Sequence, residues 1–394
     1  MRLRLRLRLR LRLRLRLRLR LRLRLRVRLR VRLPRLDLMR SRFPLCVVAA
    51  VLGCSASKDD AAAPFEVGVA ATDSSVNDAV TEGGGLTLDA FDAPETPELV
   101  DASCKDVPPS LDGGSVAVTL SAEYASFYTA YDLGPVPGMP AGHLGGCVLK
   151  EGDPSTLLFA GDSESATGGI YSIKLERGPC GHIIGWKGTA TKIASTPYVD
   201  ANLLYLPSST LLYSQWPQNK LGIIPSSASA PSREIDLGPL GVDSSIGGVG
   251  FVPKGYAAEG QMRGVTWSGG NWFHLALKPD GASWNVTGAS KMVNLPNGPG
   301  GFAYVPSGSP GFPKNRIILS EWSADSVATY EVDGQGDPLP SSRKAFFEKF
   351  TKPWGAYFDP MSGDFLFLTW GPAPDRVYVV QGFTKPPPPP PPPK

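Results

Sequence analysis

The feature that most constrains the fold of this chain is a repeat of about 50 residues. A short apolar unit opens each repeat and reads GGCVLKE, ANLLYLP, GGVGFVP, GGFAYVP and WGAYFDP. Its second position is Gly146, Asn202, Gly248, Gly301 and Gly355, with steps of 56, 46, 53 and 54 residues. Gly or Asn at this position indicates a backbone that has a positive φ or closely approaches its neighbours.

A second apolar unit follows each opening unit and ends in a polar turn. It reads LLFAGDS, LLYSQWP, RGVTWSG, RIILSEWS and FLFLTWG. Between residues 122 and 383, short runs of β-branched and aromatic residues alternate with Gly, Pro, Asn, Asp and Ser, which predicts an all-β domain. Five such repeats, each with three or four strands, predict the blades of a β-propeller. Five blades fit the spacing, whereas six would require a degenerate blade within one long repeat.

The last repeat has room for only three strands before a run of prolines begins. The segment SFYTAYDL, at Ser126–Leu133, is strand-like and precedes the first repeat. We predict that it completes the last blade next to Val377–Val380 and closes the ring, because an open ring would leave a bare strand edge.

The first 38 residues alternate Arg with Leu or Val and carry 17 of the 41 basic residues. We interpret them as a short nucleotide repeat translated upstream of the true start at Met39. A strand with one cationic face and a membrane-active peptide are the alternatives. The remaining 356 residues hold 24 basic and 35 acidic residues, so their net charge is −11. This balance excludes nucleic acid as a partner, because phosphate binding needs clustered Lys and Arg.

An export signal begins at Met39. Arg40 and Arg42 precede an apolar run of 11 residues from Phe43 to Gly53, which is too short to span a bilayer. The end of this run together with Cys54 reads VLGC and resembles a bacterial lipobox. The resemblance implies that residues 39–53 are a signal peptide and that Cys54 is lipidated. An ordinary secretory signal and an uncleaved anchor are the alternatives.

The lipid anchor would attach the protein to a membrane of the cell envelope. Ser55 follows the cysteine, with no Asp beside it. By resemblance to enterobacterial lipoprotein sorting, this implies the outer membrane. Residues 54–121 are rich in small and acidic residues and predict a flexible tether. The tail at residues 384–394 contains eight prolines, which predict a polyproline II rod that acts as a spacer or docks on an aromatic groove.

The region from Gly300 to Phe383 resembles a group of secreted propeller proteins, through GGFAYVPSGSPGF, ATYEVDGQGDP and GDFLFLTWGPAPDRVYVVQGF. The broader resemblance is to NHL-like and gluconolactonase-like propellers. Gluconolactonase-like propellers bind a divalent metal in the central channel through Glu, Asn and Asp, and that set has no residue-by-residue match here. The alternative hypothesis is an enzyme: a lactonase-like or glycan-cleaving hydrolase that uses Asp162, Asp200, Glu321 or Asp375, with a metal in the channel.

One pattern recurs at the candidate ligand-binding face. Trp216, Trp267, Trp322 and Trp370 each follow the second strand of their repeat, and Asp162 takes this place in the first repeat. The four rings should gather on one face of the propeller. They form either a platform for a glycan or other flat ligand, with Asp162, Gln215 and Glu321 as polar partners, or wedges between blades. We favour the wedges, because equivalent repeats need equivalent packing.

Cysteine and histidine add little chemistry. Cys104, Cys147 and Cys180 remain after processing, and an odd number leaves at least one unpaired. We predict a Cys104–Cys180 disulfide and a buried Cys147. The three histidines, His143, His182 and His274, lie in different repeats, so we expect structural roles and no protein-bound metal or other cofactor. The functional prediction is a binding or scaffold module on a lipid anchor, with a glycan or a protein as its ligand.

Overall fold

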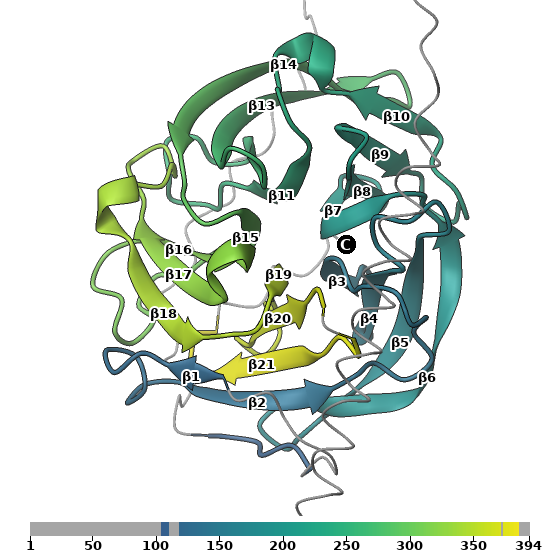
Figure 1. Cartoon of the computed structure of the whole chain (residues 1–394). Helices are drawn as coiled ribbons and strands as arrows, with labels where there is room; N and C mark the ends of the chain where they lie inside the picture. Colours follow the sequence, from purple (N-terminus) through teal and green to yellow (C-terminus); the bar gives the residue numbers. More distant parts are fainter. Residues whose placement is uncertain (1–103, 110–117, 372, 386–394) are drawn as a thin grey trace, which may run out of the picture. The chain divides into compact units, whose positions relative to one another are not determined.

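The computed structural model describes residues 104–109, 118–371 and 373–385. These residues form an all-β propeller with five blades (Figure 1). In this part of the chain, no helix has the length and hydropathy of a transmembrane segment. The predicted leader, the signal peptide, Cys54 and the polyproline run lie outside the described residues.

Each blade is an antiparallel sheet, with four strands in four blades and five in blade 4, and its first strand lies nearest the centre (Figure 1). Blade 1 contains β3 (Cys147–Lys150), β4 (Asp153–Gly161), β5 (Gly169–Arg177) and β6 (Ile183–Ser195). Blade 2 contains β7 (Val199–Leu206), β8 (Thr210–Gln215), β9 (Lys220–Ile224) and β10 (Arg233–Asp236). Blade 3 contains β11 (Ile246–Phe251), β12 (Met262–Thr266), β13 (Asn271–Asp280) and β14 (Ser283–Asn294).

The two remaining blades include strands from the start of the domain. Blade 4 contains β15 (Pro299–Tyr304), β16 (Arg316–Glu321), β17 (Ser326–Glu331) and β18 (Lys344–Lys349), with β1 (Thr119–Leu120) added outside β18. Blade 5 contains β19 (Pro353–Phe358), β20 (Phe365–Thr369), β21 (Val377–Gln381) and β2 (Thr129–Gly134). Three short 3-10 turns are η1 (Gly238–Leu240), η2 (Trp322–Ala324) and η3 (Pro340–Ser342).

The second strand of a blade is buried on both faces, which explains its continuous apolar sequence. On β4, Leu157 and Phe159 pack into the cluster shared with blade 5. The alternating residues Leu158 and Ala160 pack into the cluster shared with blade 2. The five hydrophobic clusters each lie between two neighbouring blades, so every blade depends on both neighbours for its core.

The first strands approach one another so closely at the axis that side chains are excluded. A Cβ added at Gly248 would lie 2.3 Å from the carbonyl oxygen of Gly300, and one at Gly355 would lie 2.3 Å from that of Gly145. Neither Gly248 nor Gly355 has a positive φ. Of the two explanations for the repeated glycine, close approach is therefore the correct one. In blade 2 the place is taken by Asn202, whose Oδ1 accepts a hydrogen bond from Val249 N at 3.3 Å.

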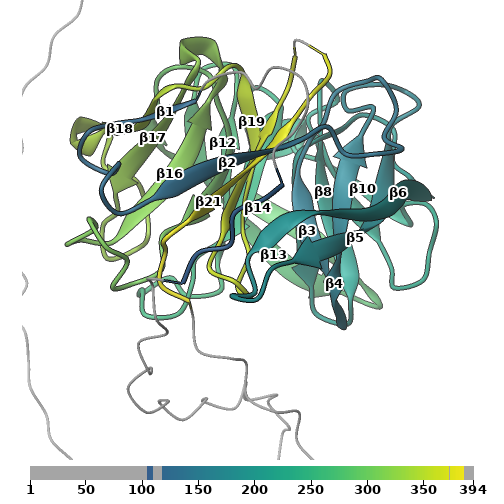
Figure 2. The ribbon, with the colours of Figure 1, turned by 90° about the horizontal axis from the view of Figure 1, so that it is seen from below.

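The ring closes through β2, as predicted. β2 pairs antiparallel with β21, with Ala130 opposite Val380 and Tyr131 opposite Val379 (Figure 2). The added strand β1 pairs with β18 in blade 4, a feature that the sequence analysis missed. The N-terminal part of the propeller thus crosses from blade 4 to blade 5 before blade 1 begins.

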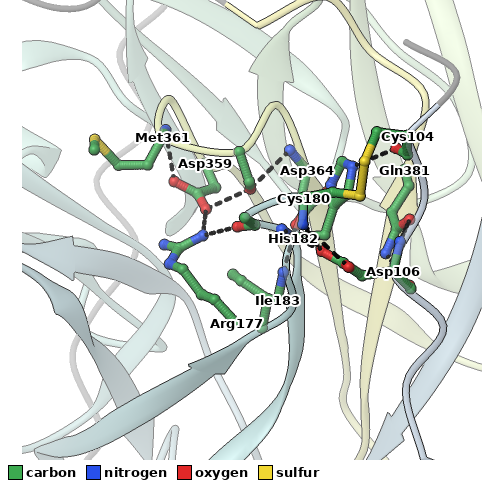
Figure 3. A network of polar contacts seen from close by, with 12 residues as sticks. Cys104, Asp106, Arg177, Cys180, His182, Ile183, Asp359, Met361, Asp364 and Gln381 are labelled. Atoms are coloured by element: carbon green, nitrogen blue, oxygen red, sulfur yellow. Dashed lines mark hydrogen bonds and ion pairs between the residues drawn. A yellow bond between two sulfur atoms is a disulfide. The ribbon is translucent and has the colours of Figure 1, made fainter. Parts of the chain in front are cut away.

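A polar clasp fastens the segment before β1 to blades 1 and 5 (Figure 3). Cys104 forms a disulfide with Cys180 of blade 1. Asp106 Oδ2 accepts hydrogen bonds from the backbone N of Cys180 at 3.0 Å and of His182 at 3.1 Å. Gln381 on β21 donates to the Asp106 carbonyl at 2.8 Å. Residues 104–109 and 118–121 were assigned to a flexible tether, but this clasp and β1 hold them against the propeller.

A glycine variant tests the close packing at the axis. Gly248→Ala places its Cβ against backbone that cannot rotate away, so we expect a loss of about 1–3 kcal/mol in the free energy of unfolding, measured by chemical denaturation. The matched control is Gly334→Ala, since a Cβ there has open space around it and no positive φ to strain it. Equal stability of the two variants would contradict the packing argument.

Candidate functional site

The loops that follow the second strand of all five blades converge on one pocket at the axis. Four of these loops contribute Trp216, Trp267, Trp322 and Trp370, and the first contributes Glu164. Trp354, from the first strand of blade 5, completes the lining. We call this cavity of about 100 Å³ the axial pocket. It brings together all four tryptophans that the sequence placed on one face.

Trp354 lies across the axis and forms the floor of the axial pocket. Its Nε1 donates a hydrogen bond to Asp200 Oδ1 in blade 2 at 2.8 Å. A Cβ added at Gly247 in blade 3 would lie 3.5 Å from its ring, and one at Gly300 in blade 4 would lie 2.8 Å from it. One buried side chain therefore touches the first strands of three other blades.

The tryptophans combine features of the two arrangements considered from the sequence. Trp267 and Trp322 of neighbouring blades meet edge to face with ring centroids 5.8 Å apart, and Trp322 meets Trp370 in the same way. Such contacts link blades, as wedges do. However, Trp216, Trp267, Trp322 and Trp370 are all half-buried and line a cavity, as a binding platform requires.

Glu164 is held in the wall of the axial pocket by an unusual backbone. Its φ is 62°, in the left-handed region that non-glycine residues rarely adopt, and Asp162, two residues earlier, has a φ of 50°. The Glu164 N–H donates to the carbonyl of Val199 at 3.0 Å, which anchors the loop to blade 2. Left-handed residues of this kind concentrate at ligand sites, where the surrounding structure maintains the strain.

Two carboxyl groups interact beneath the rings. Burial raises the pKa of Glu164 to about 7. Burial, and next the nearby charge of Glu164, raise the pKa of Asp200 well above its ordinary value. Asp200 is fully buried, and its Oδ2 has no hydrogen-bond partner among the described residues. The pocket therefore has a titratable carboxyl in its wall and a second one under its floor.

The polar partners proposed from the sequence do not line the axial pocket. Gln215 is 1% exposed and donates from its Nε2 to Tyr213 and Glu234. Glu321 is fully buried, accepts from Tyr330 at 2.6 Å and pairs with Arg343. Asp162 accepts a hydrogen bond from Thr167 within its own loop. These three residues support the blades and loops around the pocket.

The remaining candidate acid/base and metal residues also have structural partners. Asp375 is 7% exposed and accepts hydrogen bonds from Leu144 N at 3.0 Å and Gly371 N at 2.6 Å. The side chain of each histidine is hydrogen-bonded to a different aspartate: His143 to Asp375, His182 to Asp364 and His274 to Asp337. Within the described ranges, no three His, Cys, Asp or Glu side chains form a group that could hold a metal. Cys147 lies on β3 as a buried thiol.

Sequence reasoning missed Glu164 and Trp354. A signal for Trp354 was present, because this position is Gly or Ala in the other four opening units and Trp only in WGAYFDP. The signal for Glu164 was the missing tryptophan of the first repeat. The acidic residue that reaches the pocket lies two positions after Asp162, so alignment of the repeats alone did not identify it.

Among known proteins, this chain is similar to solved propeller structures of low sequence identity. A scan against protein-family models finds no match, and a search of curated proteins finds none. A solved gluconolactonase candidate shares 11% identity over 68% of this chain and 99% of its own, with a TM-score of 0.38. The PQQ-bound aldose sugar dehydrogenase of Streptomyces coelicolor shares 13% identity over 63% and 83%, with a TM-score of 0.37.

A third similar structure is the virginiamycin B lyase of Staphylococcus aureus with quinupristin. It shares 12% identity over 64% of this chain and 99% of its own, with a TM-score of 0.37. Likeness at this level carries no information about the ligand or the reaction. The axial pocket is therefore the feature that bears on function.

The raised pKa of Glu164 predicts a pH dependence of stability. The folded state holds a proton on Glu164 up to about pH 7, whereas the unfolded chain releases it near pH 4.5, so stability falls as the pH rises through this window. Glu164→Gln removes this titration. We expect the variant to match the parent at pH 4 and to exceed it by roughly 1–2 kcal/mol at pH 8, after allowance for partial exposure.

Denaturation at both pH values measures the difference. Glu348→Gln is the control, because Glu348 is exposed on β18 away from the axis. An equal gain for both glutamine variants at pH 8 would show that the effect is one of net charge and not of the buried carboxyl.

Proposed function

We propose that this chain is an exported, lipid-anchored protein whose propeller binds a small ligand in the axial pocket. The observation that carries the proposal is the composition of the pocket. Each of the five blades contributes one residue from the loop that follows its second strand. Tryptophan supplies a large apolar contact area with few rotatable bonds, which suits a preformed binding site. The export signal that ends at Cys54 and the Cys104–Cys180 disulfide both support a location outside the cytoplasm.

The hydrolase hypothesis finds less support. Glycoside hydrolysis by acid/base chemistry needs two carboxyl groups that flank one bond of the substrate. Glu164 is the one carboxylate in the lining of the axial pocket, and Asp200 is covered by the floor. Binding without chemistry is therefore the function that the geometry favours.

A pair of tryptophan variants in blade 3 tests the binding site. Trp267 lines the axial pocket, whereas Trp284 is half-buried on the outermost strand β14. In a panel of choline, glucose, N-acetylglucosamine and phenol, we expect at least one compound to change the tryptophan fluorescence and raise the Tm of the parent. That response should be lost in Trp267→Ala and kept in Trp284→Ala.

The stability of Trp267→Ala separates the two roles of the ring. We expect it to lose about 1–2 kcal/mol, less than the roughly 3–5 kcal/mol typical of a fully buried aromatic residue, because its ring is partly exposed. No response to any compound, or a response that persists in Trp267→Ala, would contradict binding at the axial pocket.

The lipid anchor is tested by fractionation in a bacterial host. Expressed from Met39, the parent should be recovered with the membranes and begin at an acylated Cys54, as determined by mass spectrometry. Cys54→Ser removes the thiol that the acyl groups need, so the variant should be released into the soluble fraction. A mature N-terminus upstream of Met39, or membrane retention of the variant, would contradict this part of the proposal.

A further inference from the structure

The walls of the axial pocket present aromatic carbon and few hydrogen-bond donors. Trp322 donates its Nε1–H to the carbonyl of Trp370 at 3.1 Å, and Trp354 donates to Asp200. The Nε1 atoms of Trp267 and Trp370 are buried and have no partner among the described residues. Two of the five indole N–H groups are thus engaged by protein acceptors, and two more are buried. A sugar, whose hydroxyls each need a polar partner, finds little in these walls.

The axial pocket contains one ionisable side chain, and it is acidic. Four blades place a tryptophan at the axial pocket, and the fifth places Glu164 there. The only lining residue with an ionisable side chain is therefore a carboxylate beside several aromatic rings. The face of an aromatic ring also carries negative electrostatic potential. The carboxylate and the faces of the indole rings both attract a cation, and neither attracts an anion.

The arrangement of the rings suits a rounded cation. The planes of Trp267 and Trp322 are inclined by 79°, and those of Trp322 and Trp370 by 75°. Rings that turn in this way from blade to blade surround a central group from several directions. The cavity of about 100 Å³ is also smaller than the roughly 300 Å³ at which drug-sized pockets begin, so it accommodates a head group and not a polymer chain.

One of these rings already holds an ammonium group. Lys352 Nζ lies 4.3 Å from the centroid of the Trp322 ring. Lys352 does not line the axial pocket, and its charge is compensated by Asp325 at 3.1 Å. The contact shows that the environment of Trp322 supports a cation against an indole ring.

We propose that the axial pocket binds a small organic cation of the quaternary ammonium type, with Glu164 as its counter-ion and the indole rings as its walls. This inference rests on the proposed ligand-binding function and narrows it to one ligand class. A quaternary ammonium group has no N–H to donate, so it needs no acceptor beyond the carboxylate. Its methyl groups pack against aromatic carbon while its charge is stabilised by the rings and by Glu164.

The test compares choline with 3,3-dimethyl-1-butanol, which has the same shape without the charge. Binding to the full chain is measured by calorimetry and tryptophan fluorescence at pH 8, with sodium chloride at matched ionic strength as the blank. We expect choline to bind at least about tenfold more tightly than the alcohol. Glu164→Gln should weaken choline binding about tenfold and leave the alcohol unchanged, whereas Glu348→Gln should change neither.

The pH dependence gives a second readout. The affinity for choline should rise between pH 6 and pH 8 as Glu164 loses its proton, and the rise should be absent in Glu164→Gln. Other charged or titratable groups near the pocket include Asp200 beside Trp354, Lys352 with Asp325 at Trp322, Asp162 in the loop of Glu164, and His143, which stacks on Trp370 with ring centroids 3.9 Å apart. The rise should therefore persist in His143→Asn.

The outcomes separate this inference from the function on which it rests. Equal affinity for choline and the alcohol, or unchanged choline binding in Glu164→Gln, would overturn the cation assignment. Binding of N-acetylglucosamine or glucose that depends on Trp267, without binding of choline, would overturn it while supporting the ligand-binding function. A pocket that responds to none of these compounds would contradict both.

Discussion

The close approach of the first strands at the axis is the constraint on which the rest of this structure depends. Gly248 faces the backbone of Gly300, and Gly355 faces that of Gly145, at distances that leave no room for a Cβ. Because five blades must meet around a narrow axis, the centre cannot contain a wide aqueous channel. The axial pocket is lined instead by the loops that follow the second strands. Trp354 then separates this space from the axis below.

Closure follows from the same geometry. Each blade is apolar on both faces, and its two hydrophobic clusters are shared with its two neighbours. Each blade therefore depends on its neighbours for stability, and the last blade has to pack against the first. The pairing of β2 with β21 supplies the backbone part of this closure. Around it, the Cys104–Cys180 disulfide and the bonds of Asp106 fasten a segment from before the propeller to both blades that meet at the seam.

Much of the fold could be predicted from the sequence, because its signals are local and repeated. The opening units became the first strands, and Ser126–Leu133 supplied the strand that closes the ring. The tryptophans at equivalent positions converged for the same reason. Glu164, Trp354 and β1 were missed, since none of them follows the repeat. Gln215 and Glu321, which the sequence suggested as ligand partners, are buried in the structure, because alternation along a strand turns the residue next to a half-buried tryptophan toward the interior between blades.

The departures from the repeat are where specificity arises. A perfectly repeated sequence would place five equivalent residues around the axis, and such a site could not orient a ligand. Three departures break this symmetry within one region: a first repeat that has no tryptophan and reaches the pocket with Glu164, Trp354 in place of a small residue, and Asn202 in place of a glycine. Asn202 bonds to the next blade and keeps the axis closed, Trp354 provides the floor, and Glu164 gives the pocket its charge. The repeat thus builds an aromatic enclosure as a consequence of folding, and a single carboxylate gives that enclosure its direction and its preference for positive charge.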